Sequence, residues 1–414
     1  MRERPLNLFF TAEIFYPDLA GGIMRFFRYG PGLVRRGVLP RVVTLRHREE
    51  LPREEEVNGI HILRLDPPDH APGSTLRTWL LKQALGMSLD SIRQGGRAAL
   101  QPAMFSHLMG PTLWEARVRG IPTFFNVTIA PDAIPRGSAV VRECRRLRMG
   151  AASFPVNRIV FLSEQLLRIH RDHWALRSKQ VRLIPNGVDL QRFRPRRSAE
   201  ERESLLRSLG FPTDRKIILF VGGVMERKGV DILLDGWDRV RREHPDAILF
   251  ILGSRGGRPS HQRPGYGNEL ETYVGKVEDR HRRLEHPESV FFHDETDDPA
   301  PFYRMADVFA FPSRCEGLPN VVLEAMACGL PCLVARFTGM PGDGEELGHA
   351  GRHFVSLGHD PDEWAEGLCA MLRPERAGNR IGMGRSARSW IETRHDLEGV
   401  LDRWASLYHE PWSP

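Results

Sequence analysis

Lysine is scarce in this sequence. Of the 59 basic residues in the 414-residue chain only five are lysines, so arginine carries nearly all of the positive charge. We attribute this bias to genome composition, and most of the arginines need no functional explanation. The net charge of +6 favours phosphorylated ligands, an anionic membrane surface or nucleic acid as partners. Because no nucleic-acid motif with the required spacing occurs, we expect one of the first two.

Long apolar runs and a secretory signal are also missing. No stretch approaches the roughly 18 apolar residues of a membrane-spanning helix. The N-terminus, MRERPLNLFF, leads directly into a strand-like segment without a separate apolar region or cleavage site. We therefore expect a cytoplasmic protein, with peripheral contact at the inner face of the cell membrane as an open alternative.

Metal-binding patterns are absent as well. The five cysteines form no paired C-x-x-C motifs, and Cys328 and Cys332 lie in an apolar run where small buried thiols are expected. No cluster of acids suits a metal, since Asp297-Asp298 is better explained as a solvated loop pair. The sequence thus predicts no metal and no cofactor.

The order of predicted elements indicates the fold class. Strands alternate with helices, which favours an α/β protein with parallel sheets covered on both faces. The length is too great for one ordinary core and suits two. No segment matches the G-x-G-x-x-G dinucleotide pattern or the P-loop lysine motif.

Domain boundaries follow from changes in pattern. A charged stretch after residue 195 separates two runs of alternating strands and helices. We predict an N-terminal and a C-terminal Rossmann-like domain. A final helical segment is predicted to pack back on the first domain. The N-terminal domain is predicted to span residues 1–195 and the C-terminal domain residues 213–390. The linker between them is residues 196–212, and the final helical segment is residues 391–414.

Two segments of the first half have more than one interpretation. Residues 66–100 are irregular, and an ordinary surface helix with a core face is favoured over an amphipathic segment near a membrane. Residues 136–148, RGSAVVRECRRLR, are strongly basic. They suit contact with anionic lipid or a solvated helix face.

The most informative stretch is PSRCEGLPNVVLEAMACGLP, residues 312–331. A strand is predicted to end at Phe311 and a helix to open near Pro319 or Asn320, since proline suits a first helical turn. Gly329 fits the left-handed cap that ends the helix. Free amides and the helix dipole make such an N-terminus an anion site, and pyrophosphate is a natural occupant.

Two glutamates flank the start of this predicted helix. Glu316 and Glu324 form an E-x7-E pattern at the carboxyl end of a parallel strand, where open α/β sheets bind ligands. Carboxylates accept strong charge-assisted hydrogen bonds from sugar hydroxyls. Alone, Glu324 would be a solvated glutamate favoured by the helix dipole, but the pair with glycine and proline at these offsets favours a sugar site.

Two further glycine-containing turns point to the same chemistry. In FVGGVMERKGVDILL, residues 220–234, Lys228 follows a strand and a glycine turn, and it can neutralise a diphosphate leaving group. A solvated lysine is the alternative, weakened here by the scarcity of lysine. Gly21-Gly22 precedes a helix in the first half and permits a phosphate or sugar to approach the backbone, although many turns carry two glycines.

These motifs together resemble glycosyltransferase family 4, the retaining enzymes with the GT-B fold. The resemblance covers nearly the whole chain. It is strongest at residues 184–193, 221–234 and 311–331, and weaker over 50–150. It implies two Rossmann-like domains with parallel sheets facing a central cleft, of which the N-terminal domain binds the acceptor and the C-terminal domain binds the nucleotide sugar. It also implies transfer of a sugar from a UDP- or GDP-sugar to a glycan, lipid-linked or small-molecule acceptor, in polysaccharide or glycoconjugate biosynthesis.

The resemblance assigns donor contacts in the second half. Glu316 matches the family glutamate that contacts the donor sugar near the reacting carbon, and the backbone of Gly317 and Leu318 would also touch that sugar. The amides of Asn320 and Val321 would hold the diphosphate.

Further positions carry over from the family pattern. Lys228 matches the diphosphate-binding lysine, and Glu324 matches the glutamate that binds the ribose. Gly22, with Gly21 beside it, matches the first-domain glycine that approaches the phosphate. His107 resembles a family histidine at a strand end, and a satisfied polar residue is an equal alternative for it.

The sequence departs from the family pattern at two positions. Members often carry arginine where this chain has Gly223, and we hypothesise that Arg227 supplies the missing charge. Many members carry histidine where this chain has Thr128, so a histidine contact with acceptor or phosphate is in doubt. Thr128 is kept as a candidate acceptor or sugar contact.

Two other functions remain open. A GT-B sugar-nucleotide epimerase would share the architecture, but the E-x7-E pattern argues against it. A non-catalytic GT-B subunit of a polysaccharide assembly should lack the lysine and glutamates that this chain retains.

Overall fold

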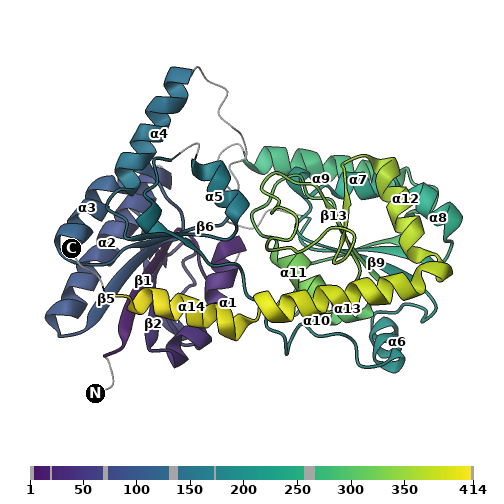
Figure 1. Cartoon of the computed structure of the whole chain (residues 1–414), viewed down its shortest axis with the longest axis horizontal. Helices are drawn as coiled ribbons and strands as arrows, with labels where there is room; N and C mark the ends of the chain where they lie inside the picture. The colour runs from purple at the N-terminus through teal and green to yellow at the C-terminus, as the bar shows by residue number, and fades with distance from the viewer. Residues whose placement is uncertain are drawn as a thin grey trace. The chain divides into compact units, whose positions relative to one another are not determined.

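The protein consists of two compact α/β units, seen in a computed structural model (Figure 1). Residues 4–18, 21–68, 73–129, 139–171, 174–255 and 266–411 are described. Unit 1 comprises Met1–Pro185 with Glu398–Pro414, and unit 2 comprises Asn186–Leu397. The boundary between them therefore falls at Pro185, and the predicted linker 196–212 contains a helix, α6 (Ala199–Ser208).

Unit 1 is built on parallel strands with connecting helices. Its strands are β1 (Leu6–Ala12), β2 (Val38–Leu45), β3 (Glu54–Val57), β4 (Ile60–Leu65), β5 (Arg97–Pro102), β6 (Phe124–Val127), β7 (Arg158–Phe161) and β8 (Val181–Leu183). Its helices are α1 (Gly21–Arg35), α2 (Gly73–Arg93), α3 (Gly110–Val118), α4 (Ala139–Ser153), α5 (Glu164–Arg171) and α14 (Leu397–His409). Short 3-10 turns lie at His107–Met109 and Ser178–Gln180.

The sheet of unit 1 has Rossmann-like connectivity. A five-stranded sheet has the order β3-β4-β2-β1-β5, and β6-β7-β8 form a second sheet that a bridge between Leu100 and Thr123 links to β5. All pairs are parallel except the hairpin β3-β4. Strand order therefore reverses between β1 and β5, and ligands of such sheets bind outside the carboxyl ends at such a point.

Unit 2 repeats this plan more regularly. Its strands are β9 (Lys216–Val221), β10 (Ala247–Leu252), β11 (Val290–His293), β12 (Val308–Phe311), β13 (Cys332–Ala335) and β14 (Val355–Leu357). Its further helices are α7 (Val230–Asp235), α8 (Trp237–Glu243), α9 (Tyr266–Arg282), α10 (Ala300–Met305), α11 (Asn320–Ala327), α12 (Pro361–Leu372) and α13 (Ala377–Arg394). The 3-10 turns are Glu226–Lys228, Pro287–Ser289 and Pro374–Arg376.

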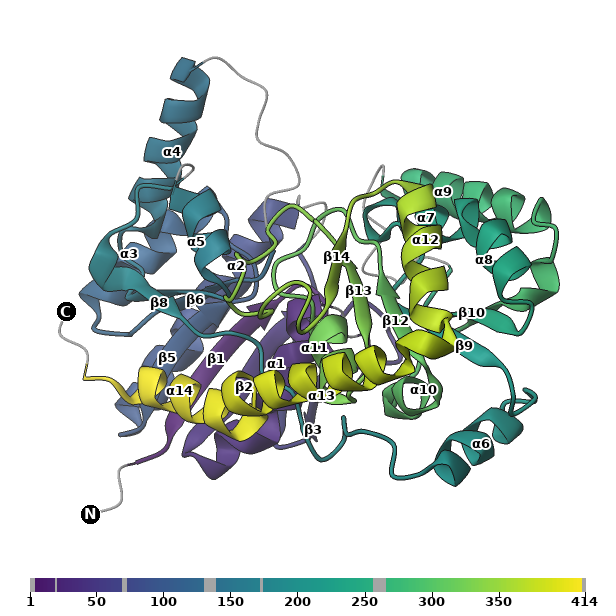
Figure 2. The ribbon, with the colours of Figure 1, turned by 45° about the vertical axis from the view of Figure 1, so that its right-hand side comes forward.

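The six strands of unit 2 form one parallel sheet in the order β11-β10-β9-β12-β13-β14 (Figure 2). Numbered within the unit, this order is 3-2-1-4-5-6, the order of the dinucleotide-binding fold, and it reverses between β9 and β12. Every residue of β10 and β12 is buried. Continuous apolar strands of this kind are expected where helices cover both faces of a parallel sheet.

The predicted fold class is confirmed: both units are α/β with parallel sheets. The predicted strand cores at Ala247–Leu252 and Val308–Phe311 coincide with β10 and β12. Residues 66–100 contain a regular helix with a buried face, α2, as favoured above. Gly329 ends the α11 segment with φ +71°.

One local prediction was wrong and one hairpin was missed. The apolar spacing of Val230, Leu233, Leu234, Trp237 and Val240 predicts one helix, but the structure has two short helices, α7 and α8, that meet at Gly236. The hairpin β3-β4 was not predicted, since EEEV carries almost no apolar signal. Residues 253–268 are rich in glycine, proline, histidine and arginine, which predicts a loop; most of them lie outside the described residues, and α9 already begins at Tyr266.

No helix among the described residues is long and apolar enough to cross a membrane. Cys328 and Cys332 are buried as predicted, together with Cys369, whereas Cys144 is exposed.

Candidate functional site

The reversal of strand order in unit 2 brings two predicted residues together. Lys228 closes the short turn after β9, and Glu316 lies in the loop after β12. These strands are neighbours, so their carboxyl ends open onto the same edge of the sheet. The Nζ of Lys228 lies 2.6 Å from Oε1 of Glu316.

Glu316 is surrounded by donors on one side only. Lys228 Nζ, Arg227 Nη1 and Ser313 Oγ lie 2.6, 2.7 and 2.9 Å from the same oxygen, Oε1. Within the described residues no donor reaches Oε2. We call Arg227, Lys228, Ser313 and Glu316 the ion-pair cluster.

The charges of the cluster are strongly coupled. Burial acts to raise the pKa of the Glu316 carboxyl, but the charges of Lys228 and Arg227 outweigh it, so the pKa is lowered. Burial lowers the pKa of the Lys228 ammonium, opposed by the Glu316 charge and reinforced by Arg227. Glu316 is therefore an ionised carboxylate in a largely dry setting.

Backbone packing holds the two loops of the cluster against each other. Gly229, at φ +73°, packs so tightly that a Cβ would lie 2.2 Å from the Pro312 carbonyl oxygen, so only glycine fits. The amide of Arg314 donates to the carbonyl of Arg227 at 2.7 Å, and Glu316 N donates to Thr338 O. Lys228 and Glu316 are thus placed by the main chain as well as by their own charges.

A second ion pair fixes the same loop to α7. Arg314 contacts both carboxylate oxygens of Asp231, at 3.1 and 2.8 Å, and the Tyr273 hydroxyl donates to Asp231 at 2.6 Å. Burial acts to raise the pKa of Asp231, but these hydrogen bonds outweigh it and the pKa is lowered. This pair stiffens the loop without contacting Glu316.

The start of α11 is an open set of backbone donors. Pro319 stands at the N-cap without a side-chain capping bond, and the first intrahelical amides are those of Val322 and Leu323, which donate to Pro319 O. Within the described residues, no acceptor contacts the amides of Asn320 and Val321. Their free N–H groups and the helix dipole favour an anion here.

The predicted sugar-contact residues Gly317 and Leu318 lie between Glu316 and this helix start. The carbonyl of Leu318 accepts a hydrogen bond from Asn186 Nδ2 at 2.8 Å, which fixes the peptide between Leu318 and Pro319. Oδ1 of Asn320 is buried and finds no partner among the described residues.

Glu324 lies further along α11, 5% exposed. Its Oε2 accepts a hydrogen bond from the fully buried Tyr303 hydroxyl at 2.9 Å. This contact orients the carboxylate from α10, and it shows that Glu324 is not the solvated helix-start glutamate of the alternative interpretation.

In unit 1 the structure brings together Gly22 and Thr128. Gly22 lies in the first turn of α1, which begins at Gly21, and a Cβ at Gly22 would lie 3.2 Å from Cγ2 of Thr128. Two residues before Thr128, the Asn126 side chain is 5% exposed, and neither of its amide atoms has a hydrogen-bond partner within the described residues.

His107 lies apart from the end of β5, in a 3-10 turn. It is exposed, and its Nε2 lies 3.0 Å from Nη2 of Arg148 on α4. Its predicted role in sugar or acceptor contact stays a prediction.

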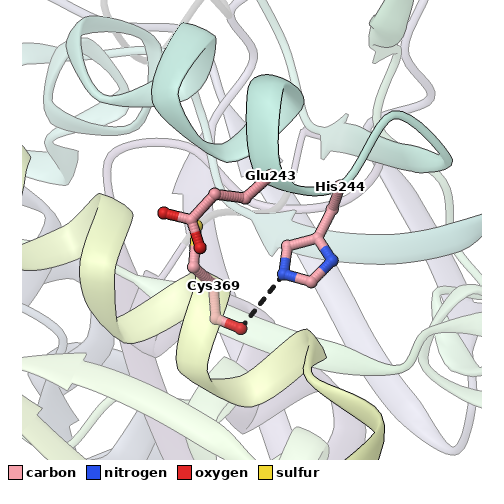
Figure 3. Close-up of side chains that lie close together, drawn as sticks. All are labelled: Glu243, His244 and Cys369. Atoms are coloured by element: carbon pink, nitrogen blue, oxygen red, sulfur yellow. Dashed lines mark hydrogen bonds between the residues drawn. The ribbon is translucent and has the colours of Figure 1, made fainter.

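A separate cluster joins α8 to α12 (Figure 3). Ligand-type atoms of Glu243, His244 and Cys369 lie within 4.8 Å of one another. However, His244 Nε2 contacts the Cys369 carbonyl at 3.2 Å, and Glu243 pairs with Arg373. Burial, then the charge of Glu243, raises the pKa of the Cys369 thiol to about 11. We therefore interpret Glu243, His244 and Cys369 as residues that pack α8 against α12.

Sequence reasoning missed three side chains of the site. Ser313 lies three residues before Glu316 in the stretch 312–331 discussed above, so its hydroxyl could have been predicted from the sequence as a site residue. Asp231 and Tyr303 carried none, because their importance comes from contacts with Arg314 and Glu324 across the fold.

Solved structures with related architecture identify the fold. Sucrose-phosphate synthase from Thermosynechococcus elongatus has a TM-score of 0.75 at 20% identity, with 99% of both chains covered. HepE from Anabaena, in complex with UDP and glucose, has a TM-score of 0.72 at 14% identity, with 98% of this chain and 99% of that chain covered. The chain has the GT-B fold.

Sequence comparison adds a family match to the second half. Residues 215–374 match the model of the family described as Glycosyl transferases group 1. A D-inositol 3-phosphate glycosyltransferase of Xylanimonas cellulosilytica is 35% identical over 212 residues, which is 51% of this chain and 47% of that protein. The chain thus spans about half the length of the curated relatives it matches. The matched region contains the ion-pair cluster and α11.

Proposed function

We propose that the protein is a glycosyltransferase that moves a sugar from a nucleotide-sugar donor to an acceptor with retention of anomeric configuration. The ion-pair cluster is the observation that carries the proposal. Donors saturate Oε1 of Glu316 and leave Oε2 without a partner in the described residues. An ionised carboxylate oxygen without a protein donor accepts strong hydrogen bonds, and a sugar hydroxyl would supply one.

The leaving diphosphate would bind beside this carboxylate. The Lys228 ammonium has three protons and Glu316 takes one, so others remain for phosphate oxygens. The amides of Asn320 and Val321 offer further N–H groups at the positive end of α11. Glu324, oriented by Tyr303, would accept hydrogen bonds from the ribose hydroxyls.

The chemistry is electrostatic. The bond between the sugar's anomeric carbon and the diphosphate oxygen breaks, and the acceptor oxygen bonds to that carbon on the same face. The acceptor proton passes to the leaving phosphate oxygen, so the products are a glycoside and a nucleoside diphosphate. Lys228 and the α11 amides stabilise the negative charge that builds on the leaving group.

Metal is not assigned a role in this proposal, because Lys228 and the helix amides can carry the charge. Turnover that is unchanged by a chelator is the expected result. Loss of turnover with EDTA and recovery with a divalent cation would contradict this part of the proposal.

The donor nucleotide can be identified by thermal unfolding against UDP-, GDP-, ADP- and dTDP-sugars. A ligand that binds only the folded state raises the melting temperature when it is well above its Kd. We expect one nucleotide class to stabilise the protein, with the shift lost in Lys228→Ala and Glu324→Ala. The solved HepE complex with UDP and glucose makes a UDP-sugar the first choice.

Two outcomes would overturn the proposal. No shift with any nucleotide sugar would favour a non-catalytic GT-B subunit. A change of the sugar nucleotide into its epimer without an acceptor, followed by NMR, would favour an epimerase.

A further inference from the structure

Exposed apolar side chains are concentrated in one part of unit 1. Ten large apolar side chains are exposed among the described residues, and seven of them lie between residues 104 and 154. Four lie on or beside α3 and α4, which pack against each other (Figure 1). We call these four the α3–α4 patch: Trp114, Val118, Leu147 and Phe154.

The patch is continuous rather than scattered. Trp114 and Val118 are one turn apart on α3 and share a helix face, and Phe154, the residue after α4, follows Leu147 by seven residues, about two helical turns. The Trp114 and Phe154 rings stack across the two helices, with centroids 5.4 Å apart. Both rings remain over 40% exposed, and Val118 is 79% exposed. A stacked aromatic pair facing solvent costs free energy that a binding partner would recover.

Positive charge surrounds the patch. The Arg177 guanidinium stacks over the Phe154 ring at 3.9 Å, and Arg148 lies on α4 beside Leu147. Burial, then the charge of Arg117, lowers the pKa of Arg177. Within the described residues, Arg117, Arg148 and Arg177 contact no carboxylate. Arginines without a carboxylate partner, next to exposed aromatic rings, favour a binding surface with anionic groups on its outside and an apolar layer below them.

We propose that the α3–α4 patch is a peripheral docking surface for an anionic phospholipid bilayer. Tryptophan is enriched at the depth of lipid headgroups, where its apolar ring and N–H are both satisfied. Arginines near the headgroups add electrostatic attraction, and the apolar side chains enter the acyl boundary. For residues 136–148 the sequence left lipid contact and a solvated helix face as equal alternatives, and the aromatic residue of α3 gave no membrane signal.

Vesicle flotation of the whole chain tests the proposal. We expect binding to vesicles with about one-third phosphatidylglycerol at low salt, and little binding to pure phosphatidylcholine. Trp114→Ala with Phe154→Ala should weaken binding about tenfold, and Arg117→Gln or Arg148→Gln should weaken it about fivefold each. Ile381→Ala and Arg93→Gln are matched controls, because both side chains are well exposed elsewhere, and they should bind as the unaltered chain does.

A second readout locates the bound surface. Brominated lipids quench tryptophan that enters the bilayer, and the quenching should fall in Trp114→Phe although seven other tryptophans remain. Circular dichroism confirms that each variant is folded. Flotation needs no turnover, so this inference and the proposed function can fail separately.

Three results would overturn the inference. The chain fails to float with anionic vesicles, the patch variants float unchanged, or neutral vesicles bind equally well. If the chain forms dimers that Trp114→Ala with Phe154→Ala abolishes, without any vesicle binding, the surface instead contacts a second copy of the chain.

Discussion

The two units share a parallel α/β architecture but carry different side chains at the carboxyl ends of their strands. In unit 2, the loops after β9 and β12 carry Lys228 and Glu316, and their charges are paired at 2.6 Å. In unit 1, Gly22 lies so near Thr128 that an added Cβ would come within 3.2 Å of its Cγ2, and Asn126 is buried with both amide atoms unpartnered in the described residues. One edge is charged and preorganised, and the other leaves polar atoms unsatisfied.

This difference fits two kinds of ligand. A diphosphate always has the same shape and charge, so a fixed set of donors can serve it without reorganisation. An unpaired amide in a buried position costs free energy until a ligand supplies its hydrogen bonds. We infer that the fixed donors of unit 2 suit the diphosphate, which is the same in every nucleoside-diphosphate-sugar donor. The unpaired amide of Asn126 in unit 1 suits a ligand group that varies between enzymes.

Glu316→Gln should produce the largest effect on activity. The substitution keeps the shape but removes the charge that balances Lys228 and Arg227, leaving two cations with a neutral amide. We expect turnover to fall on the order of 100-fold, and the free energy of unfolding to fall by roughly 1–3 kcal/mol. Steady-state kinetics and urea unfolding measure the two effects.

The control for this variant is Glu375→Gln, an exposed glutamate in a 3-10 turn of the same unit. It should change neither quantity. Full turnover in Glu316→Gln would show that the ion-pair cluster has only a structural role. The difference between the two edges would then say nothing about function.

The sequence predicted the charged edge better than the other. Strand, glycine turn and helix signals around residues 220–234 and 311–331 are local, so the placement of Lys228 and the start of α11 followed from patterns within each segment. The contact of Arg227 with Glu316 joins residues 89 positions apart, and no local signal predicts it.

The other edge was harder to predict for a physical reason. Asn126 lies in the short strand FFNV, where a single polar residue gives no periodic signal, and its unsatisfied amide is visible only in three dimensions. Gly22 was predicted from a glycine pair that many turns share, and its contact with Thr128 depends on packing between α1 and the end of β6.

Arg227→Ala should produce the second largest effect. If Arg227 supplies the charge that the family carries at the Gly223 position, its loss should raise the donor KM about fivefold to tenfold. Isothermal titration with the donor nucleotide measures the same loss as affinity. An unchanged KM would remove Arg227 from the donor site.

The position itself offers a matched rescue. A Cβ at Gly223 would meet only the flexible Met225 side chain, at 3.2 Å, and a carbonyl oxygen at 3.9 Å. Gly223→Arg combined with Arg227→Ala should therefore restore part of the donor affinity. Gly222→Arg is the matched negative control, because Gly222 has φ +153°, which arginine rarely adopts.

Asn126→Leu should separate stability from activity in unit 1. The leucine removes two buried polar atoms that lack partners in the described residues, so the free energy of unfolding should stay within about 1 kcal/mol or rise. We expect the acceptor KM to rise about fivefold while the donor KM stays constant. Marked destabilisation without a kinetic effect would show that Asn126 serves the fold alone.

Glu201→Gln should have the smallest effect on activity, and it provides the comparison for Glu316 within unit 2. The Glu201 carboxylate accepts hydrogen bonds from Nη1 and Nη2 of Arg194, at 3.1 and 2.8 Å. Its Oε1 also lies 3.0 Å from Nε of Arg304. The hydrogen bonds from Arg194 lower the pKa of Glu201 to about 2. Like Glu316 it is a paired carboxylate with a lowered pKa, but it lies in α6 and not at the sheet edge.

The pH dependence of this variant gives the sharper measurement. Because the folded pKa lies below the unfolded value of about 4.3, the ion pair stabilises the fold fully above that pH and loses its effect as pH falls toward 2. The melting temperatures of the unaltered chain and Glu201→Gln should therefore differ at pH 7, draw closer below about pH 4.3 and converge only as pH approaches 2. Donor affinity at pH 7 should be the same in both proteins. If it falls as far as in Glu316→Gln, any broken ion pair in unit 2 disables the site, and the special role of the ion-pair cluster is contradicted.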